Sequence, residues 1–98
     1  MKLLILPSAR DDLAEGFAFY ERQAEGLGEY FLDGLFSDIE SLRVYAGIHR
    51  QILGHCRLLS RRFPFAVYYT WHAGVASIVA VLDCRRDPAW IRGQLNSR

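Results

Sequence analysis

The fold of this chain is decided by residues 63 to 82, which run from Phe63 to Leu82 as FPFAVYYTWHAGVASIVAVL. As far as His72, two sets of side chains alternate, namely Phe63, Phe65, Val67, Tyr69, Trp71 and Pro64, Ala66, Tyr68, Thr70, His72. This period of two, with its aromatic and β-branched residues, predicts a central β-strand. Gly74 can adopt a positive φ angle, so His72-Ala73-Gly74 predicts a tight turn. Residues 75 to 82 are apolar on both faces and predict a second, largely buried strand.

Further strands and a helix are predicted around this stretch. Residues 56 to 60 complete a three-stranded meander, and residues 3 to 6 form a short, fully apolar strand that Pro7 ends. A helix then begins with Ser8 as its N-cap and ends near Gly26. Its apolar face consists of Ala9, Leu13, Phe17, Tyr20 and Ala24, whereas Asp12 falls elsewhere and adds negative charge near the helix start.

A second helix is predicted from about Gly28, with an apolar stripe of Leu27, Phe31, Leu35, Ile39 and Leu42. The short link makes the two helices an antiparallel hairpin, and their unsatisfied stripes place this hairpin on the sheet. Residues 45 to 54 lack a steady period and are predicted as a loop. Asp87-Pro88 predicts the N-cap and first position of a short terminal helix. We therefore expect one α+β domain over residues 1–98, in the order β-α-α-β-β-β(-α), with a helical hairpin packed on an antiparallel sheet.

The composition is typical of a single cytoplasmic domain. With 98 residues, 51% of them hydrophobic, the chain can bury one core, and no apolar run approaches the roughly 20 residues of a membrane span. The apolar start stops at Pro7 without a small-residue cleavage site, which favours a strand over a signal peptide. Neither Cys56 and Cys84 nor the three scattered histidines have the spacing of a metal site. We expect a cytoplasmic protein that needs no metal and no cofactor.

The net charge of +1 is unevenly distributed. Residues 1–40 carry three basic and nine acidic residues, a charge of −6, whereas residues 41–98 carry nine arginines and two aspartates, a charge of +7. This split predicts an acidic, solvated face on the first half and an anion-binding face on the second. Alternatively, the two halves neutralise each other across their own interface.

Arginines cluster at two places in the second half of the chain. Arg57, Arg61 and Arg62 lie around the first predicted hairpin turn, and Arg85 and Arg86 follow the last strand. The planar guanidinium group binds carboxylates and phosphates alike, so this cluster predicts an anionic macromolecular partner. The alternative is that Arg61 and Arg62 are merely solvated turn residues. Of the aromatic residues, Tyr68 and Trp71 remain candidates for stacking on a partner, because every other residue of their strand faces the core.

The run from Arg61 to Tyr69, followed by the run from Val79 to Pro88, resembles the RelE/ParE family of bacterial toxins. Pro7-Ser8-Ala9-Arg10-Asp11-Asp12-Leu13 and Gly28-Glu29-Tyr30-Phe31-Leu32 are also similar to that family's helical hairpin, so the resemblance spans nearly the whole chain. It implies the toxin of a type II toxin–antitoxin pair. Such a toxin is held inactive in a hetero-oligomer by a cognate antitoxin with an acidic, amphipathic tail. One branch of the family poisons DNA gyrase, and another cleaves messenger RNA on the ribosome.

The resemblance also implies where the functional residues lie. Cleaving members use a basic residue before a Leu/Val-x-Tyr triplet, an arginine at the end of the last strand and a tyrosine in the terminal helix. Here these positions hold Ala66, Arg85 and a residue near Trp90 or Ile91, and Asp83 replaces the family's usual histidine before the Arg-Arg pair. Because most of the acid–base set is missing, the resemblance favours a ParE-like gyrase inhibitor. The expected effector residues are Arg57, Arg61, Arg85 and Arg86, and the expected antitoxin-binding residues are Arg57, Arg62, Tyr68, Trp71 and Trp90.

Two other functions fit the same sequence. The first is a ribosome-dependent endoribonuclease that uses Arg57, Arg85 and either Arg61 or His55. The second is an inactive relative whose sole activity is to bind its antitoxin.

Overall fold

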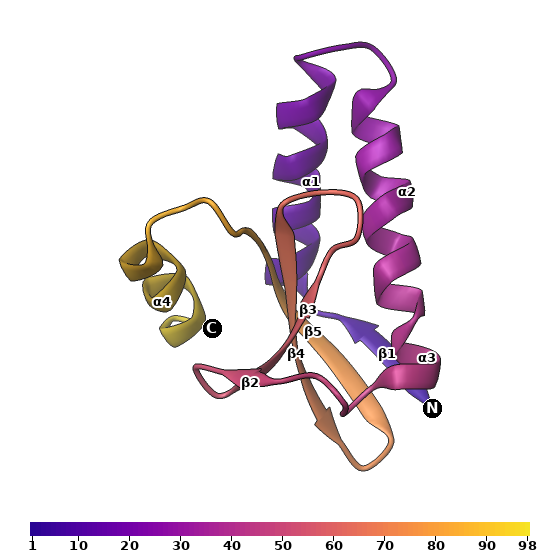
Figure 1. Cartoon of the computed structure of the whole chain (residues 1–98), viewed down its shortest axis with the longest axis vertical. Coiled ribbons are helices and arrows are strands. Elements are labelled where there is room, and N and C mark those ends of the chain that lie inside the picture. Colours follow the sequence, from indigo (N-terminus) through magenta and orange to yellow (C-terminus); the bar gives the residue numbers. More distant parts are fainter.

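The computed structural model describes residues 1–98 and contains four helices and five strands. In chain order these are β1 (Lys2–Ile5), α1 (Pro7–Glu21), α2 (Leu27–Glu40), α3 (Leu42–Tyr45), β2 (Gln51–Ile52), β3 (His55–Leu59), β4 (Phe65–His72), β5 (Val75–Asp83) and α4 (Pro88–Asn96). The α1–α2 hairpin covers one face of the sheet, and α4 lies on the other face (Figure 1). The predicted α+β class, the helical hairpin and the β3–β4–β5 meander are confirmed.

The sheet is mixed rather than purely antiparallel. Its strand order is β1-β5-β4-β3-β2. Neighbouring strands from β2 to β5 pair antiparallel, but β1 pairs parallel with β5, with Lys2 opposite Val75 and Ile5 opposite Ile78. The sequence patterns could not predict this direction, because it depends on how the chain returns to the sheet after the helical hairpin. β1 is consequently an edge strand with alternating exposure, although its residues from Leu3 to Ile5 are all apolar.

The strand alternation read from the sequence builds two hydrophobic clusters. Phe65, Val67 and Tyr69 of β4 face the hairpin and join a cluster of 14 buried residues, whereas Ala66 and Tyr68 join a cluster of five under α4. Burial on both sides explains why this strand and β5 are apolar on both faces. Burying these side chains supplies most of the favourable free energy of folding.

The helical hairpin is close-packed at two glycines. A Cβ atom on Gly16 would lie 2.5 Å from the Phe31 ring, and one on Gly28 would lie 2.8 Å from the Phe17 ring. The predicted stripe of the second helix is buried at Phe31, Leu35 and Ile39 of α2 and partly buried at Leu27. Leu42 is also buried, but it is the first residue of α3 because α2 ends at Glu40. On α1, however, Asp12 is buried, with 8% of its surface exposed, and is not on a solvated side as predicted.

The helix ends differ from the prediction. α1 begins at Pro7, and the Ser8 hydroxyl donates a hydrogen bond of 2.9 Å to the Val79 carbonyl instead of capping the helix. α1 ends at Glu21, before Gly26, which has a φ angle of 87° and precedes α2. The Glu21 carboxylate accepts hydrogen bonds from the amides of Gly26 and Gly28, at 3.1 Å and 2.9 Å. The last residue of α1 thus stabilises the segment that connects the two helices.

The segment predicted as a loop, residues 45 to 54, contains the end of α3 and the two-residue strand β2. Such a short strand gives too few alternating positions for a pattern to predict it. Asp87 caps α4 as predicted, since its carboxylate accepts a hydrogen bond of 2.8 Å from the Ala89 amide. None of the four helices has both the length and the apolar content that a membrane crossing requires.

Candidate anion-binding site

Two arginine-bearing turns lie together at one end of the sheet, opposite the β4–β5 turn (Figure 1). Phe65 of β4 pairs with Asp83 of β5, and the Cys84 amide donates a hydrogen bond of 2.8 Å to the Pro64 carbonyl. The turn that carries Arg61 and Arg62 therefore lies beside the segment that carries Arg85 and Arg86. Two segments that are well separated in the sequence thus form one basic surface.

Asp83 orients Arg85 within this surface. The Asp83 carboxylate accepts hydrogen bonds from Nε and Nη2 of Arg85, at 3.0 Å and 2.7 Å, and from the Arg85 amide at 2.8 Å. This pair holds the pKa of Asp83 below its usual value, mainly through the side-chain hydrogen bond from Arg85. The Arg85 side chain is 60% exposed, so the outer edge of its guanidinium group faces solvent. Asp83 and Arg85 thus form a short-range ion pair at the end of β5.

Arg86 and Arg62 each stack on an aromatic ring. The Arg86 guanidinium carbon lies 3.7 Å from the centre of the Trp90 ring, and that of Arg62 lies 4.3 Å from the centre of the Tyr30 ring. Stacking limits the freedom of each side chain while leaving N–H groups at the ring's edge that can bind an anion. One N–H group of Arg62 is already used, since Nη1 donates a hydrogen bond of 3.4 Å to the Tyr30 carbonyl. Trp90, predicted as an antitoxin contact, therefore already supports an arginine within the chain.

The turn that presents Arg61 is held by Asp38 of α2. Asp38 is only 4% exposed, and its carboxylate accepts a hydrogen bond of 2.6 Å from the Ser60 hydroxyl. The Ser60 hydroxyl oxygen in turn accepts a hydrogen bond of 3.3 Å from the Phe63 amide. A buried carboxylate from the acidic half of the chain thus shapes a turn in the basic half, a role that the sequence pattern did not indicate.

Arg57 lies on the α4 side of the sheet, opposite Tyr68. Burial raises the pKa of the Tyr68 hydroxyl, and Arg57 partly offsets this increase. Burial of the thiol also raises the pKa of Cys84, even though the residue as a whole is exposed. Tyr68, predicted as an antitoxin contact, is only 3% exposed beneath α4, whereas Trp71 is 40% exposed near the opposite end of β4.

The two halves of the chain neutralise each other at few points. Three ion pairs are present, of which Glu40–Arg43 joins near neighbours and Asp83–Arg85 lies within the basic half. Only Asp12–Arg98 crosses between distant parts of the two halves. Arg57, Arg61, Arg62 and Arg86 form no ion pair, so most of the predicted basic cluster is not neutralised within the chain.

This arrangement can bind anions and stabilise negative charge, but it offers little for proton transfer at neutral pH. Arg57 has two titratable neighbours, Tyr68 and Cys84. Both have raised pKa values and therefore stay protonated at neutral pH. Of the histidines, His49 is hydrogen-bonded to the Tyr69 hydroxyl at 2.5 Å, and His55 is hydrogen-bonded to the Leu53 carbonyl at 3.1 Å. No group of three or more His, Cys, Asp or Glu side chains is placed to hold a metal ion.

Sequence reasoning missed an apolar groove of about 490 Å³ on the hairpin side of the molecule. It is lined by Ile5, Arg10, Leu13, Ala14, Phe17, Leu32 and Phe36. Phe36 is 44% exposed, and Arg10 is the one charged residue in the lining. Leu32 and Phe36, four residues apart and outside the main stripe of α2, were the signal in the sequence for this second apolar face.

No protein-family model matches the sequence, and no curated protein matches it. A solved structure with a similar fold is described as the chromosomal ParDE TA system from P. aeruginosa. The two chains superpose with a TM-score of 0.68 at 18% sequence identity, over 83% of this chain and 92% of that chain. At this identity the similarity shows a shared fold, in line with the predicted RelE/ParE-like arrangement.

Proposed function

We propose that this chain is the toxin of a type II toxin–antitoxin pair, that it acts in the cytoplasm by inhibiting DNA gyrase, and that a cognate antitoxin neutralises it. The observation that carries this proposal is the basic surface formed by the two arginine-bearing turns on a ParDE-like fold. Of its arginines, only Arg85 has an acidic partner within the chain. Such a surface is suited to an acidic macromolecule.

The surface chemistry supports an antitoxin with an acidic, amphipathic tail. Apolar side chains of the tail would enter the groove between α1, α2 and β1, where Phe17, Leu32 and Phe36 line the walls. Acidic side chains of the tail would pair with Arg10 at the groove and with Arg62 at the β3–β4 turn. Arg57, within β3 on the α4 side of the sheet, offers a further basic contact. Trp71, which is 40% exposed, offers a further apolar contact.

Gyrase inhibition is favoured over messenger RNA cleavage by the chemistry of the basic surface. Cleavage requires one group that removes the proton of the 2′-hydroxyl and another that protonates the leaving oxygen. The position of the expected strand base is Ala66, which is fully buried, and Tyr68 has a raised pKa under α4. Arginines alone stabilise charge in the transition state but do not exchange protons at neutral pH.

A supercoiling assay with purified gyrase and the purified chain tests this proposal. We expect the wild-type chain to inhibit supercoiling and Arg85→Ala to lose most of the inhibition while remaining folded. Arg43→Ala is the matched control, because Arg43 is also an exposed arginine in an ion pair but lies on α3. Wild-type and Arg43→Ala proteins should inhibit equally.

The assay also separates the alternative functions. If the wild-type chain leaves supercoiling unchanged but cuts transcripts at codon-linked positions on ribosomes, it is an endoribonuclease and the gyrase proposal is wrong. If expression without any antitoxin neither arrests growth nor affects either target, the chain is an inactive relative that binds only its antitoxin. Retained inhibition by Arg85→Ala would show that Arg85 is not an effector residue.

A further inference from the structure

The last residue of the chain is bound to the first helix at a gap in the sheet ladder. β1 pairs with β5 only as far as Ile78, because the chain turns into α1 at Pro7. On the other side of β5, pairing with β4 shifts from Tyr68–Ala80 to Tyr69–Ile78, which leaves Val79 without a partner. The Val79 carbonyl and the Val81 amide therefore have no hydrogen-bond partner in a neighbouring strand and need partners from elsewhere.

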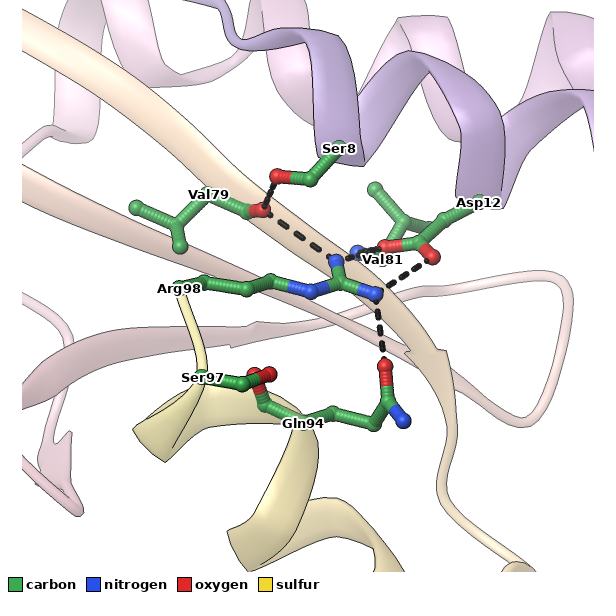
Figure 2. Close-up of polar contacts among 7 residues, drawn as sticks. All are labelled: Ser8, Asp12, Val79, Val81, Gln94, Ser97 and Arg98. Carbon is green, nitrogen blue, oxygen red and sulfur yellow. Dashed lines mark hydrogen bonds and ion pairs between the residues drawn. The ribbon is translucent and has the colours of Figure 1, made fainter.

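Side chains from α1 and the C-terminal segment satisfy these groups (Figure 2). The Val79 carbonyl accepts hydrogen bonds from the Ser8 hydroxyl at 2.9 Å and from Nη1 of Arg98 at 3.3 Å. The Val81 amide donates a hydrogen bond of 2.9 Å to Oδ2 of Asp12. Asp12 and Arg98 thus take the place that a longer β1 would occupy.

Asp12 and Arg98 also form a two-pronged ion pair between themselves. Nη2 of Arg98 donates to Oδ1 of Asp12 at 2.9 Å, and Nη1 donates to Oδ2. Side-chain exposure is only 14% for Arg98 and 8% for Asp12. Gln94 of α4 accepts a further hydrogen bond of 2.9 Å from Nη2, so the guanidinium group ties α4 to α1 and β5 together (Figure 2).

Few other contacts hold α4 on the sheet. Leu95 is its one buried residue, and Trp90 and Ile91 pack partly against Ala66, Tyr68, Ala80 and Leu82. Arg86 stacks on Trp90 just before α4 begins. The position of Arg86 therefore depends on the position of α4. Because α4 makes few other contacts with the sheet, its position depends in turn on the hydrogen bonds of Arg98 at its C-terminal end.

We propose that Asp12 and Arg98 are positioning residues for Arg86: their ion pair holds α4 against the sheet and thereby fixes Trp90 and the arginine stacked on it. The effect on target inhibition rests on the proposed function, but the effect on geometry does not. Through this pair, the first helix determines the arrangement of a basic segment that lies far from it in the sequence.

Quenching of Trp90 fluorescence by acrylamide tests the geometry. In a Trp71→Phe background, Trp90 is the single tryptophan, so it reports whether α4 is seated. We expect Arg98→Ala to raise the quenching constant at least about twofold, because α4 opens locally while the rest stays folded. Arg98→Lys should restore part of the protection. Arg92→Ala is the control, since Arg92 is an exposed arginine of α4 without an ion pair, and it should not change quenching.

Asp12→Asn provides the second variant. The amide oxygen of asparagine can still accept from the Val81 amide, so the ladder gap stays satisfied while the charge that binds Arg98 is removed. We expect increased quenching here too, with an unchanged far-ultraviolet spectrum. If Arg98→Ala fails to fold, Asp12→Asn decides the question. Wild-type quenching in a folded Asp12→Asn or Arg98→Ala protein would overturn the proposal.

The supercoiling assay then separates this inference from the proposed function. If wild-type inhibits gyrase, Arg98→Ala should lose inhibition in proportion to its quenching change, and Arg92→Ala should not. Equal inhibition by wild-type and an open Arg98→Ala protein would overturn the link to Arg86. If the wild-type chain does not inhibit gyrase, the proposed function fails, and the quenching series alone supports or overturns the positioning role.

Discussion

At the scale of single residues, Asp83 shows how an acidic side chain can serve a basic surface. It binds Arg85 through Nε and Nη2, which uses two of the five guanidinium N–H groups. The remaining N–H groups point away from Asp83 and can bind a second anion in an end-on geometry. Asp83 therefore reduces the positive charge of the surface by one unit. It also holds Arg85 in one orientation, so less side-chain entropy is lost when Arg85 binds an anion.

We expect Asp83→Asn to destabilise the protein by less than about 1 kcal/mol at pH 7, because the partner Arg85 is largely exposed. The folded-state pKa of Asp83 is lowered, so its contribution is present above the unfolded pKa of about 3.9 and is lost as the pH falls through the folded pKa. Urea unfolding at pH 7 and at about pH 2.5 measures this difference. A gap between variant and wild type that persists at the lower pH would show that the charge is not its cause.

At the scale of elements, the two helical layers differ in how tightly they pack. The α1–α2 hairpin meets at Gly16 and Phe31 without room for a methyl group, whereas a Cβ atom on Gly93 of α4 would have no neighbouring atom within 4 Å. Close packing makes the hairpin one rigid unit. Because α4 is less closely packed, only a few contacts hold it against the sheet.

Replacing glycine by alanine should therefore have opposite effects on protein stability in the hairpin and in α4. We expect Gly16→Ala to destabilise the protein by about 1–3 kcal/mol, because the added Cβ would overlap the Phe31 ring. Gly93→Ala should stabilise by up to about 1 kcal/mol, because alanine favours a helix interior and meets no other atom. Chemical denaturation of both variants checks the pair. A stabilised Gly16→Ala protein would contradict the packing described for the hairpin.

At the scale of the whole molecule, the stability should depend on one histidine in the mildly acidic range. His49 and the Gly47 amide bind the Tyr69 hydroxyl, at 2.5 Å and 3.0 Å, and fasten the segment before β2 to the sheet. Burial lowers the pKa of His49. The unfolded chain then binds a proton more readily than the folded chain, so stability falls as the pH drops below the unfolded value of about 6.5.

His49→Gln should flatten this dependence, since glutamine does not titrate. The free energy of unfolding, measured from about pH 7.5 down to about pH 5, should decline less in the variant than in the wild type. His72→Gln is the control, because His72 is exposed beside the β4–β5 turn and should leave the decline unchanged. A decline of the same size in His49→Gln would assign the effect to another group.

The uneven charge of the molecule leads to a prediction about its association with an acidic antitoxin. Because Arg61, Arg62 and Arg86 lie exposed at one end of the sheet without an ion pair, the association rate should fall steeply as the salt concentration rises. Stopped-flow or surface-based kinetics at several salt concentrations would measure the slope. The double variant Arg61→Gln, Arg62→Gln should have a shallower slope than wild type, and Arg43→Gln should not.

Much of the fold could be predicted because its signals are local. The alternation of residues 65–72, the stripe of α2 and the Asp87-Pro88 helix start each depend on neighbours in the sequence, and each is confirmed. The predicted cap of α1 was wrong, because Ser8 binds a strand that the chain reaches 71 residues later. Tyr68 was predicted to be available for stacking, and its burial follows from the position of α4, which no local pattern specifies.

The sequence by itself determined the class of the fold, the helical hairpin, the meander and the presence of an arginine-rich end of the sheet. Only the tertiary structure decided that β1 runs parallel to β5, that Asp38 shapes the Arg61 turn and that Asp12 binds Arg98. The physical reason is the range of the interactions involved. Periodicity and capping act over a few residues, whereas a buried carboxylate binds whichever donor folding brings to it, here one 86 positions away.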